Sequence, residues 1–192
     1  MEFKYMLVGN EFYGDQEVFE QKKVSQEAEG AKWSCQNYNK VISGEKNAPI
    51  NKKANSQSGC AIVTMKTQKD MVIEFMKILS LAHMCAVETF TNKEGTIEKF
   101  YNGPSPDEVA LVEYASYMEF DCINSEKDYI SMTSNKTLTR YEVYRRMDFN
   151  SDRKRMSVLL KDPLDNQYKL LIKGADSIIK SRLDKNQFPK EM

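Results

Sequence analysis

The last third of the sequence alternates strand-like segments with short polar turns, and this alternation limits the folds open to the chain. Aromatic and β-branched residues fill the segments, and Asn, Asp, Ser, Lys and Gly fill the breaks. Short turns join neighbouring antiparallel strands, whereas parallel strands need a crossover of roughly a dozen residues or more. The pattern therefore predicts an antiparallel sheet with strands in FDCINS, YISMTS, KTLTRYEVYRRMDF, RMSVLLKDP and QYKLLIKGAD.

Two predicted helices precede this sheet and a short one follows it. Residues 70–90, DMVIEFMKILSLAHMCAVETF, contain no Gly or Pro and place apolar residues at helical spacing. We interpret His83, beside that apolar face, as a packed imidazole rather than a ligand. A second helix begins at SPDE, where Ser105 is the predicted N-cap, Pro106 fills the first turn and Glu108 completes a capping box. With a last helix in ADSIIKSRL, the elements predict an α+β fold, a mostly antiparallel sheet flanked by helices.

The amino-terminal part of the chain has a different character. FKYMLV predicts an entry strand that ends in a turn rich in Gly, Asn and Asp. Residues 20–60 are rich in Lys, Asn, Ser, Gln and Glu, and their apolar residues follow neither strand nor helix spacing. We predict one domain over residues 1–192 that carries a polar, flexible insertion at about 20–60.

Charge and composition exclude several classes of protein. Lys and Arg together number 28, as do Asp and Glu, so the chain lacks the basic excess of a nucleic-acid binder. No apolar run approaches the roughly 20 residues of a transmembrane helix, and the start lacks the apolar core of a signal peptide. Four widely spaced cysteines and a single histidine do not suit a zinc site and indicate a reduced, cytosolic setting.

Three stretches suit a flat, anionic ligand, although each also has a simpler explanation. In MDFNSDRKRMSVLL, Phe149 precedes three cations, which also fits a strand end and a solvated basic turn. SPDE also fits a helix start without any ligand. In LLIKGADSII, Lys173 ends a strand and Gly174 turns the chain into a helix, an arrangement that attracts anions or simply connects two elements. Neither GxxxxGK[ST] nor GxGxxG precedes a helix, so the common nucleotide-binding loops are absent.

In order and spacing, these stretches resemble the nucleotide-binding (N) domain of a P-type ATPase of the phospholipid-translocating, or flippase, class. SPDEVALVEYA, DFNSDRKRMSV and IKGADSII carry the resemblance, and FMKILSLAHMC looks like the family's Leu-Cys-His-Thr helix with Leu-Ala-His-Met in its place. The resemblance implies that Phe149 stacks on adenine, that Glu108 lies near the adenine amino group and that Lys173 lines the base of the pocket. Arg153 and Lys154 match the basic turn near the phosphates. The ATP-binding residues expected in this way are Phe149, Glu108, Lys173, Lys154, Arg153, Asp107, Ser151 and Gly174.

The sequence also departs from the family. It has no Asp-Lys-Thr-Gly-Thr motif, whose aspartate accepts the phosphate, it carries Val109 where the family commonly has Gly, and it stops before a later arginine motif. We therefore expect an excised or truncated ATP-binding domain, monomeric and inactive alone, with no catalytic or metal-binding residue of its own. The resembled parent is an integral membrane pump that hydrolyses Mg-ATP and translocates a phospholipid. The expected partners are ATP or ADP and the parent's phosphorylation, actuator and membrane domains, on the cytosolic side and without nucleic acid.

Two other interpretations stay open on the sequence. One is the same domain of a cation-transporting P-type ATPase, although those pumps tend to carry other residues before Glu108 and Pro in place of Asp176. The other is a non-catalytic interaction domain, in which the segment around Trp33 binds a partner and the pocket is vestigial.

Overall fold

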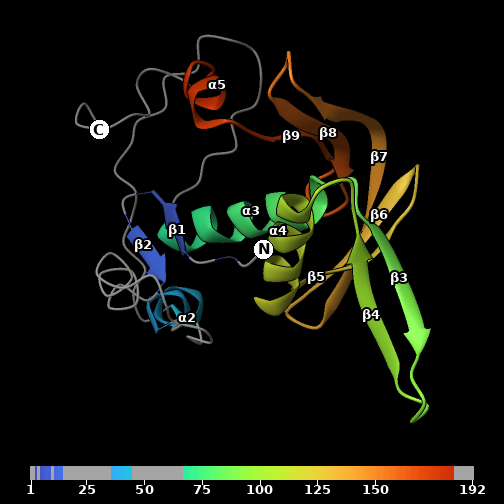
Figure 1. Cartoon of the computed structure of the whole chain (residues 1–192). Coiled ribbons are helices and arrows are strands. Elements are labelled where there is room, and N and C mark those ends of the chain that lie inside the picture. The colour runs from blue at the N-terminus through green and yellow to red at the C-terminus, as the bar shows by residue number, and fades with distance from the viewer. Residues whose placement is uncertain (1–2, 4, 10, 15–35, 45–66, 184–192) are drawn as a thin grey trace, which may run out of the picture. The chain divides into compact units, whose positions relative to one another are not determined.

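A computed structural model describes residues 3, 5–9, 11–14, 36–44 and 67–183 of the chain. The chain divides into two compact units, residues 2–75 and residues 76–192. Figure 1 labels the helices and strands of both. The prediction of a single domain with an insertion stays a prediction.

The unit of residues 2–75 contains a hairpin and a helix that the sequence patterns did not reveal. The predicted entry strand is confirmed as β1 (Tyr5–Val8), and it pairs antiparallel with β2 (Glu11–Gly14). The Gln68 amide donates hydrogen bonds to Val8 O (2.6 Å) and to Tyr13 Oη (2.8 Å), which ties the start of the next helix to this hairpin. Within the segment 20–60, the described residues form helix α2 (Gln36–Ser43), so this part is not the irregular stretch that composition suggested, and Trp33 lies outside the described residues.

The helix predicted over residues 70–90 is shorter than expected. Helix α3 spans Gln68–Leu81, and the AVETF stretch instead forms strand β3 (Ala86–Thr91). The helix stops because the Cys85 backbone N–H donates to the His83 Nδ1 atom (3.0 Å), so a side chain replaces the carbonyl that a continuing helix would supply. The prediction of a helix is therefore wrong over residues 82–90.

The five predicted strands of the last third are confirmed in the unit of residues 76–192. They form one antiparallel meander in the order β5-β6-β7-β8-β9, as the short polar turns predicted. A single-turn helix, α5 (Asp176–Lys180), follows the last strand. The strands are β5 (Phe120–Ser125), β6 (Tyr129–Ser134), β7 (Thr137–Asn150), β8 (Arg155–Asp162) and β9 (Gln167–Gly174). The α+β class is confirmed.

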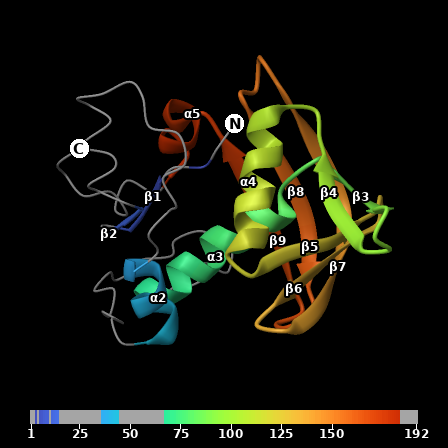
Figure 2. The same ribbon diagram turned by 60° about the horizontal axis from the view of Figure 1, so that its bottom comes forward.

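Helix α4 (Pro106–Tyr117) lies against one face of this sheet, as Figure 2 shows. Its cap is the predicted one, because Ser105 Oγ accepts the Glu108 backbone N–H at 3.2 Å. Its buried side consists of Ala110, Val112, Tyr114 and Ala115, whereas Val109 and Leu111 are only half-buried. The sheet contributes a row of buried side chains from alternate positions: Cys122, Ile130, Met132, Tyr141, Val143, Met156, Val158, Leu160 and Leu171.

Strands β3 and β4 (Ile97–Asn102) form a separate two-stranded hairpin that projects from the sheet (Figure 1). Its base is fixed to β5, because the Tyr101 hydroxyl lies 2.8 Å from Asp121 Oδ1 and 3.0 Å from Cys122 O. Lys99 forms an ion pair with the same carboxylate. Burial raises the pKa of Asp121, but the hydrogen bonds from Lys99, Ser116 and Tyr101 outweigh it and hold that pKa below its usual value. The hairpin is therefore anchored at its base by an ionised carboxylate, Asp121.

No helix among the described residues is long and apolar enough to cross a membrane.

Candidate functional site

Two of the predicted site residues meet where helix α4 begins and strand β9 ends. Glu108 stands in the first turn of α4 and Lys173 is the last residue but one of β9. Lys173 Nζ lies 3.1 Å from Glu108 Oε1, and the two side chains are 17% and 11% exposed. The capping-box interpretation of Glu108 is therefore only half realised, because Ser105 caps the helix while the Glu108 carboxylate is directed to Lys173.

The Lys173 amine keeps donor capacity for a ligand. Burial lowers the pKa of Lys173, and the neighbouring Glu108 carboxylate partly restores it. The contact between them is an ion pair rather than a well-directed hydrogen bond, and the amine makes no other hydrogen bond within the described part of the chain. A buried ammonium with unused N–H groups attracts an acceptor, such as a ring nitrogen or a phosphate oxygen.

Two buried residues near this pair, His83 and Cys85, were not connected with it by sequence reasoning. His83 is fully buried, as the packed-imidazole interpretation predicted, and its Nδ1 atom accepts the Cys85 N–H. Burial, followed by the charges of Lys173 and Arg146, lowers the pKa of His83 to about 3, so the imidazole is neutral. Burial, assisted by Glu108, raises the pKa of the Cys85 thiol to about 11. Neutral His83 and protonated Cys85 are thus two uncharged groups within electrostatic range of the ion pair.

The basic turn joins β7 to β8 and is pinned to the end of β9. The Lys154 N–H donates to Asn150 O (2.8 Å), and Lys154 takes up a left-handed backbone conformation with φ +50°. The Lys154 carbonyl accepts the Ala175 N–H at 3.0 Å, and this hydrogen bond links the turn to the end of β9. The Lys154 and Ser151 side chains are exposed. The Arg153 guanidinium is partly engaged, because it donates to Asp148 O at 3.1 Å and to Ser157 Oγ at 3.2 Å.

Phe149 is a 60% exposed aromatic at the end of β7, in a bulge between Met147 and Asn150. Lys173 pairs with Met156 on the intervening strand, so Phe149 and Lys173 stand two strands apart, roughly 10 Å at the usual strand spacing. Exposure of so large an apolar ring leaves its face free for a flat ligand.

Gly174 and Asp107 have different places in this arrangement. Gly174 pairs with Arg155, and a Cβ atom there would lie 2.5 Å from Lys154 O. Only glycine allows the basic turn to approach the strand end this closely. Asp107 is exposed in the first turn of α4, and the structure gives it no partner among the described residues. Glu108, Gly174 and the Lys154 backbone thus lie beside or next to Lys173, whereas no hydrogen bond or ion pair between described residues joins Ser151, the Arg153 side chain or Asp107 to it.

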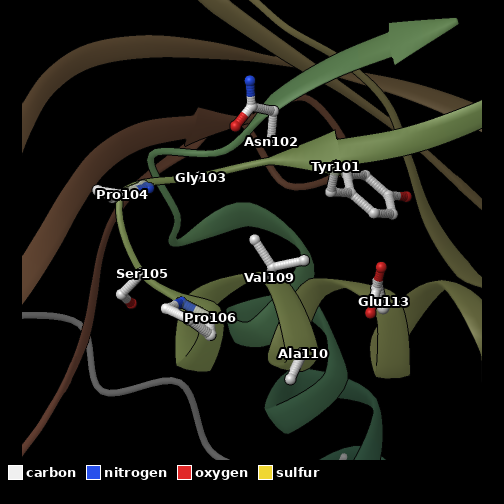
Figure 3. A pocket seen from close by; sticks show the side chains of 9 residues that line it. All are labelled: Tyr101, Asn102, Gly103, Pro104, Ser105, Pro106, Val109, Ala110 and Glu113. Carbon is white, nitrogen blue, oxygen red and sulfur yellow. The ribbon is translucent and has the colours of Figure 1, made fainter. Parts of the chain in front are cut away.

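A separate pocket of about 260 Å³ lies between strand β4 and helix α4. Figure 3 shows its lining: Tyr101, Asn102, Gly103, Pro104, Ser105, Pro106, Val109, Ala110 and Glu113. None of the predicted site residues lines it, and no sequence pattern indicated it. Gly103, which lines it, lies close against Cys85, because a Cβ there would lie 2.5 Å from Cys85 Sγ.

A comparison with protein families matches residues 72–188 to the model of the P-type ATPase cytoplasmic domain N. This match covers more than half of the chain and all of the predicted site residues. The chain belongs to this family. The P-type ATPase N domain that the sequence motifs suggested is therefore confirmed, and the antiparallel α+β fold agrees with it.

Curated relatives of this N domain are phospholipid-transporting ATPases. The chain is 39% identical over 112 residues to phospholipid-transporting ATPase IC of Xenopus tropicalis, covering 58% of this chain and 8% of that protein. It is 37% identical over 120 residues to the probable phospholipid-transporting ATPase IM of Homo sapiens, covering 62% and 10%. A match to the NEO1 protein of Saccharomyces cerevisiae is 27% identical and covers 79% of this chain and 13% of that protein. The resemblance to the flippase class is confirmed, and the chain spans about a tenth of the length of these relatives.

Proposed function

We propose that this chain binds the adenine nucleotide of a phospholipid-transporting P-type ATPase and presents its γ-phosphate to a separate phosphorylation domain. The observation that carries the proposal is the buried Glu108–Lys173 pair, two strands away from the exposed ring of Phe149. The family match and the names of the relatives support it.

The base is proposed to lie between Phe149 and Lys173. Stacking on an aromatic ring contributes roughly 1–3 kcal/mol for a base. A Lys173 N–H donates to a ring nitrogen of adenine, and the Glu108 carboxylate accepts from the exocyclic amino group. An acceptor at this position favours adenine over guanine, because guanine presents a carbonyl oxygen where adenine has its amino group.

The phosphates are proposed to lie along the basic turn. Lys154 is exposed and supplies a mobile charge, Ser151 supplies a hydroxyl, and Arg153 must loosen its hold on Asp148 or Ser157 to reach a phosphate. The described residues hold no group of three side chains suited to a metal ion. The magnesium of Mg-ATP is proposed to be held elsewhere in the parent enzyme.

The parent is proposed to be an integral membrane pump that hydrolyses ATP to move a phospholipid, with this domain on the cytosolic side. The relatives' names state phospholipid transport for those proteins, and the cytoplasmic description of the matched family supports the location. The proposed partners are ATP or ADP and the parent's phosphorylation, actuator and membrane domains.

An ATP titration followed through backbone amide resonances tests nucleotide binding. We expect a dissociation constant in the high micromolar to millimolar range, because roughly 4–6 kcal/mol is available from one stacked base and a few solvated charges. Phe149→Ala should weaken binding by roughly 1–3 kcal/mol with little loss of stability, since the ring is already exposed. Tyr168→Ala is the matched control, because Tyr168 is a 59% exposed aromatic on the same sheet. If Phe149→Ala and Tyr168→Ala bind ATP with equal affinity, Phe149 does not stack on the base.

A further inference from the structure

The projecting β3–β4 hairpin carries an aromatic and acidic face that the nucleotide site does not use. Phe90 and Phe100 are 46% and 38% exposed, and their ring centroids lie 5.9 Å apart. The strand register places Glu98 opposite Phe90 and Glu88 opposite Phe100, so the two rings and two carboxylates share one face of the hairpin. Each ring therefore has a carboxylate directly across from it on the neighbouring strand.

The two carboxylates are held in place but not neutralised. The Asn102 side chain donates to Glu88 Oε1 at 2.9 Å, and the Asn92 side chain donates to Glu98 Oε1 at 2.8 Å. Within the described part of the chain, neither carboxylate forms an ion pair. Of the two lysines in residues 86–102, Lys99 points to the opposite face and binds Asp121, and Lys93 lies in the turn between the strands. Fixed carboxylates without a cation form a preorganised site for one.

The backbone of the hairpin is also available. Strands β3 and β4 pair only with each other among the described strands, so each has an edge that an extended peptide can join. The root is fixed to β5 through Tyr101 and Asp121, which keeps the projecting part in one orientation. An isolated two-stranded hairpin is only marginally stable in water, and a bound third strand would stabilise it.

We propose that this hairpin face is a docking site for a basic, extended peptide segment of a partner protein. The cations of such a segment lie over the rings of Phe90 and Phe100 and pair with Glu88 and Glu98, while its backbone joins a hairpin edge. The same negative charge disfavours a membrane surface, because the cytoplasmic leaflet is anionic. This inference does not depend on nucleotide binding.

The test uses the full chain and a short synthetic peptide of alternating arginine and threonine, followed by amide resonances. The expected shifts fall in residues 86–102, and a peptide of alternating glutamate and threonine gives none. Phe90→Ala with Phe100→Ala should weaken binding roughly tenfold through the lost ring contacts. Glu88→Lys with Glu98→Lys should abolish binding and change the thermal unfolding of the chain only slightly, because each exposed position loses a single solvent-exposed hydrogen bond.

Two matched controls keep the test specific. Tyr168→Ala removes an exposed aromatic elsewhere, and Glu142→Lys reverses an exposed charge on β7, so both should leave peptide affinity unchanged. Shifts that map outside the hairpin, or equal losses in the controls, would overturn the proposal. Binding to phosphatidylserine-containing vesicles that the two Phe substitutions abolish would overturn it in favour of a membrane contact.

Discussion

At the scale of single residues, Glu108 and Lys173 act as counter-ions for each other, and both side chains are largely buried. If Glu108 served only to cap the helix, Glu108→Gln would leave the free energy of unfolding unchanged, because Gln also serves at that capping position. The structure changes this expectation, since Ser105 provides the cap and the Glu108 carboxylate balances a buried ammonium. Loss of either charge leaves the other without its partner.

A double-mutant cycle measures this coupling. Glu108→Gln and Lys173→Met should each lower the free energy of unfolding by up to roughly 3 kcal/mol, the lower end for a buried pair, because both side chains keep some exposure. The double variant should regain part of that loss, while ATP affinity stays low in all three. Urea denaturation gives the stabilities. Losses that simply add would show that the two side chains do not interact.

His83 gives the chain a specific sensitivity to acid. The pKa of His83 is about 3 in the folded state and about 6.5 when unfolded, so between these values the unfolded chain binds more protons. Its contribution to stability is therefore complete above pH 6.5 and falls as the pH drops toward 3, by about 1.4 kcal/mol per unit. His83→Asn keeps an acceptor for the Cys85 N–H and should lose this slope.

Denaturant unfolding at pH 6.5 and pH 5 checks the His83 prediction. The comparison of slopes cancels the carboxylates, which titrate alike in both proteins. His83 is the only histidine in the sequence, so its ring resonances report its titration without overlap. An imidazole that titrates near 6.5 in the folded chain would refute the burial argument.

At the scale of elements, the end of β9 and the basic turn behave as one piece. Gly174 permits their close approach, and the Ala175 N–H to Lys154 O hydrogen bond joins them. Gly174→Ala places a Cβ 2.5 Å from Lys154 O and 2.6 Å from Arg155 Cβ, which forces the strand and the turn apart. We expect a loss of roughly 1–3 kcal/mol in stability and weaker ATP binding, with shifts in the Lys154 and Ala175 amides. Ser151→Ala, at an exposed position of the same turn, should change neither stability nor these amides.

The elements that the sequence predicted well are those with local signals. The five sheet strands are separated by recognisable turns, and Ser105 and Pro106 mark the start of α4. The end of α3 carries no Gly or Pro, and its stop depends on the His83 side chain, so periodicity extended the helix too far. The contact between Glu108 and Lys173 had no local signal either, because it depends on how α4 lies against the sheet. The family resemblance, rather than residue spacing, assigned both residues to one site.

At the scale of the whole molecule, the chain should bind ATP without hydrolysing it. The proposed mechanism of the parent requires a carboxylate nucleophile in an Asp-Lys-Thr-Gly-Thr context, and the sequence contains no such motif. Purified chain should leave ATP intact over hours, with or without Mg²⁺, and labelled ATP should yield no acid-stable phosphoprotein. A phosphorylated Asp or Glu found by mass spectrometry would contradict this prediction.

The division into two units was less predictable than either unit's local structure. Composition suggested one irregular insertion over residues 20–60, whereas the described part of that segment forms helix α2. Strand β2 also escaped prediction, because four residues are too few for a clear alternation. In contrast, every site residue expected from the family lies in the unit of residues 76–192, where the sequence marks the turns and helix caps clearly.

The pairing of Glu108 with Lys173 also bears on how long a nucleotide would stay in the proposed site. An entering base must separate these two side chains or share the lysine with the carboxylate, so it gives up one attraction to gain another. At an ordinary association rate of about 10⁶ M⁻¹s⁻¹, a dissociation constant near 1 mM corresponds to a residence time of roughly a millisecond. A nucleotide held so briefly reaches equilibrium with the surrounding ATP pool between successive encounters with another domain. Occupancy of the proposed site would then follow the concentration of ATP in the cell almost instantly.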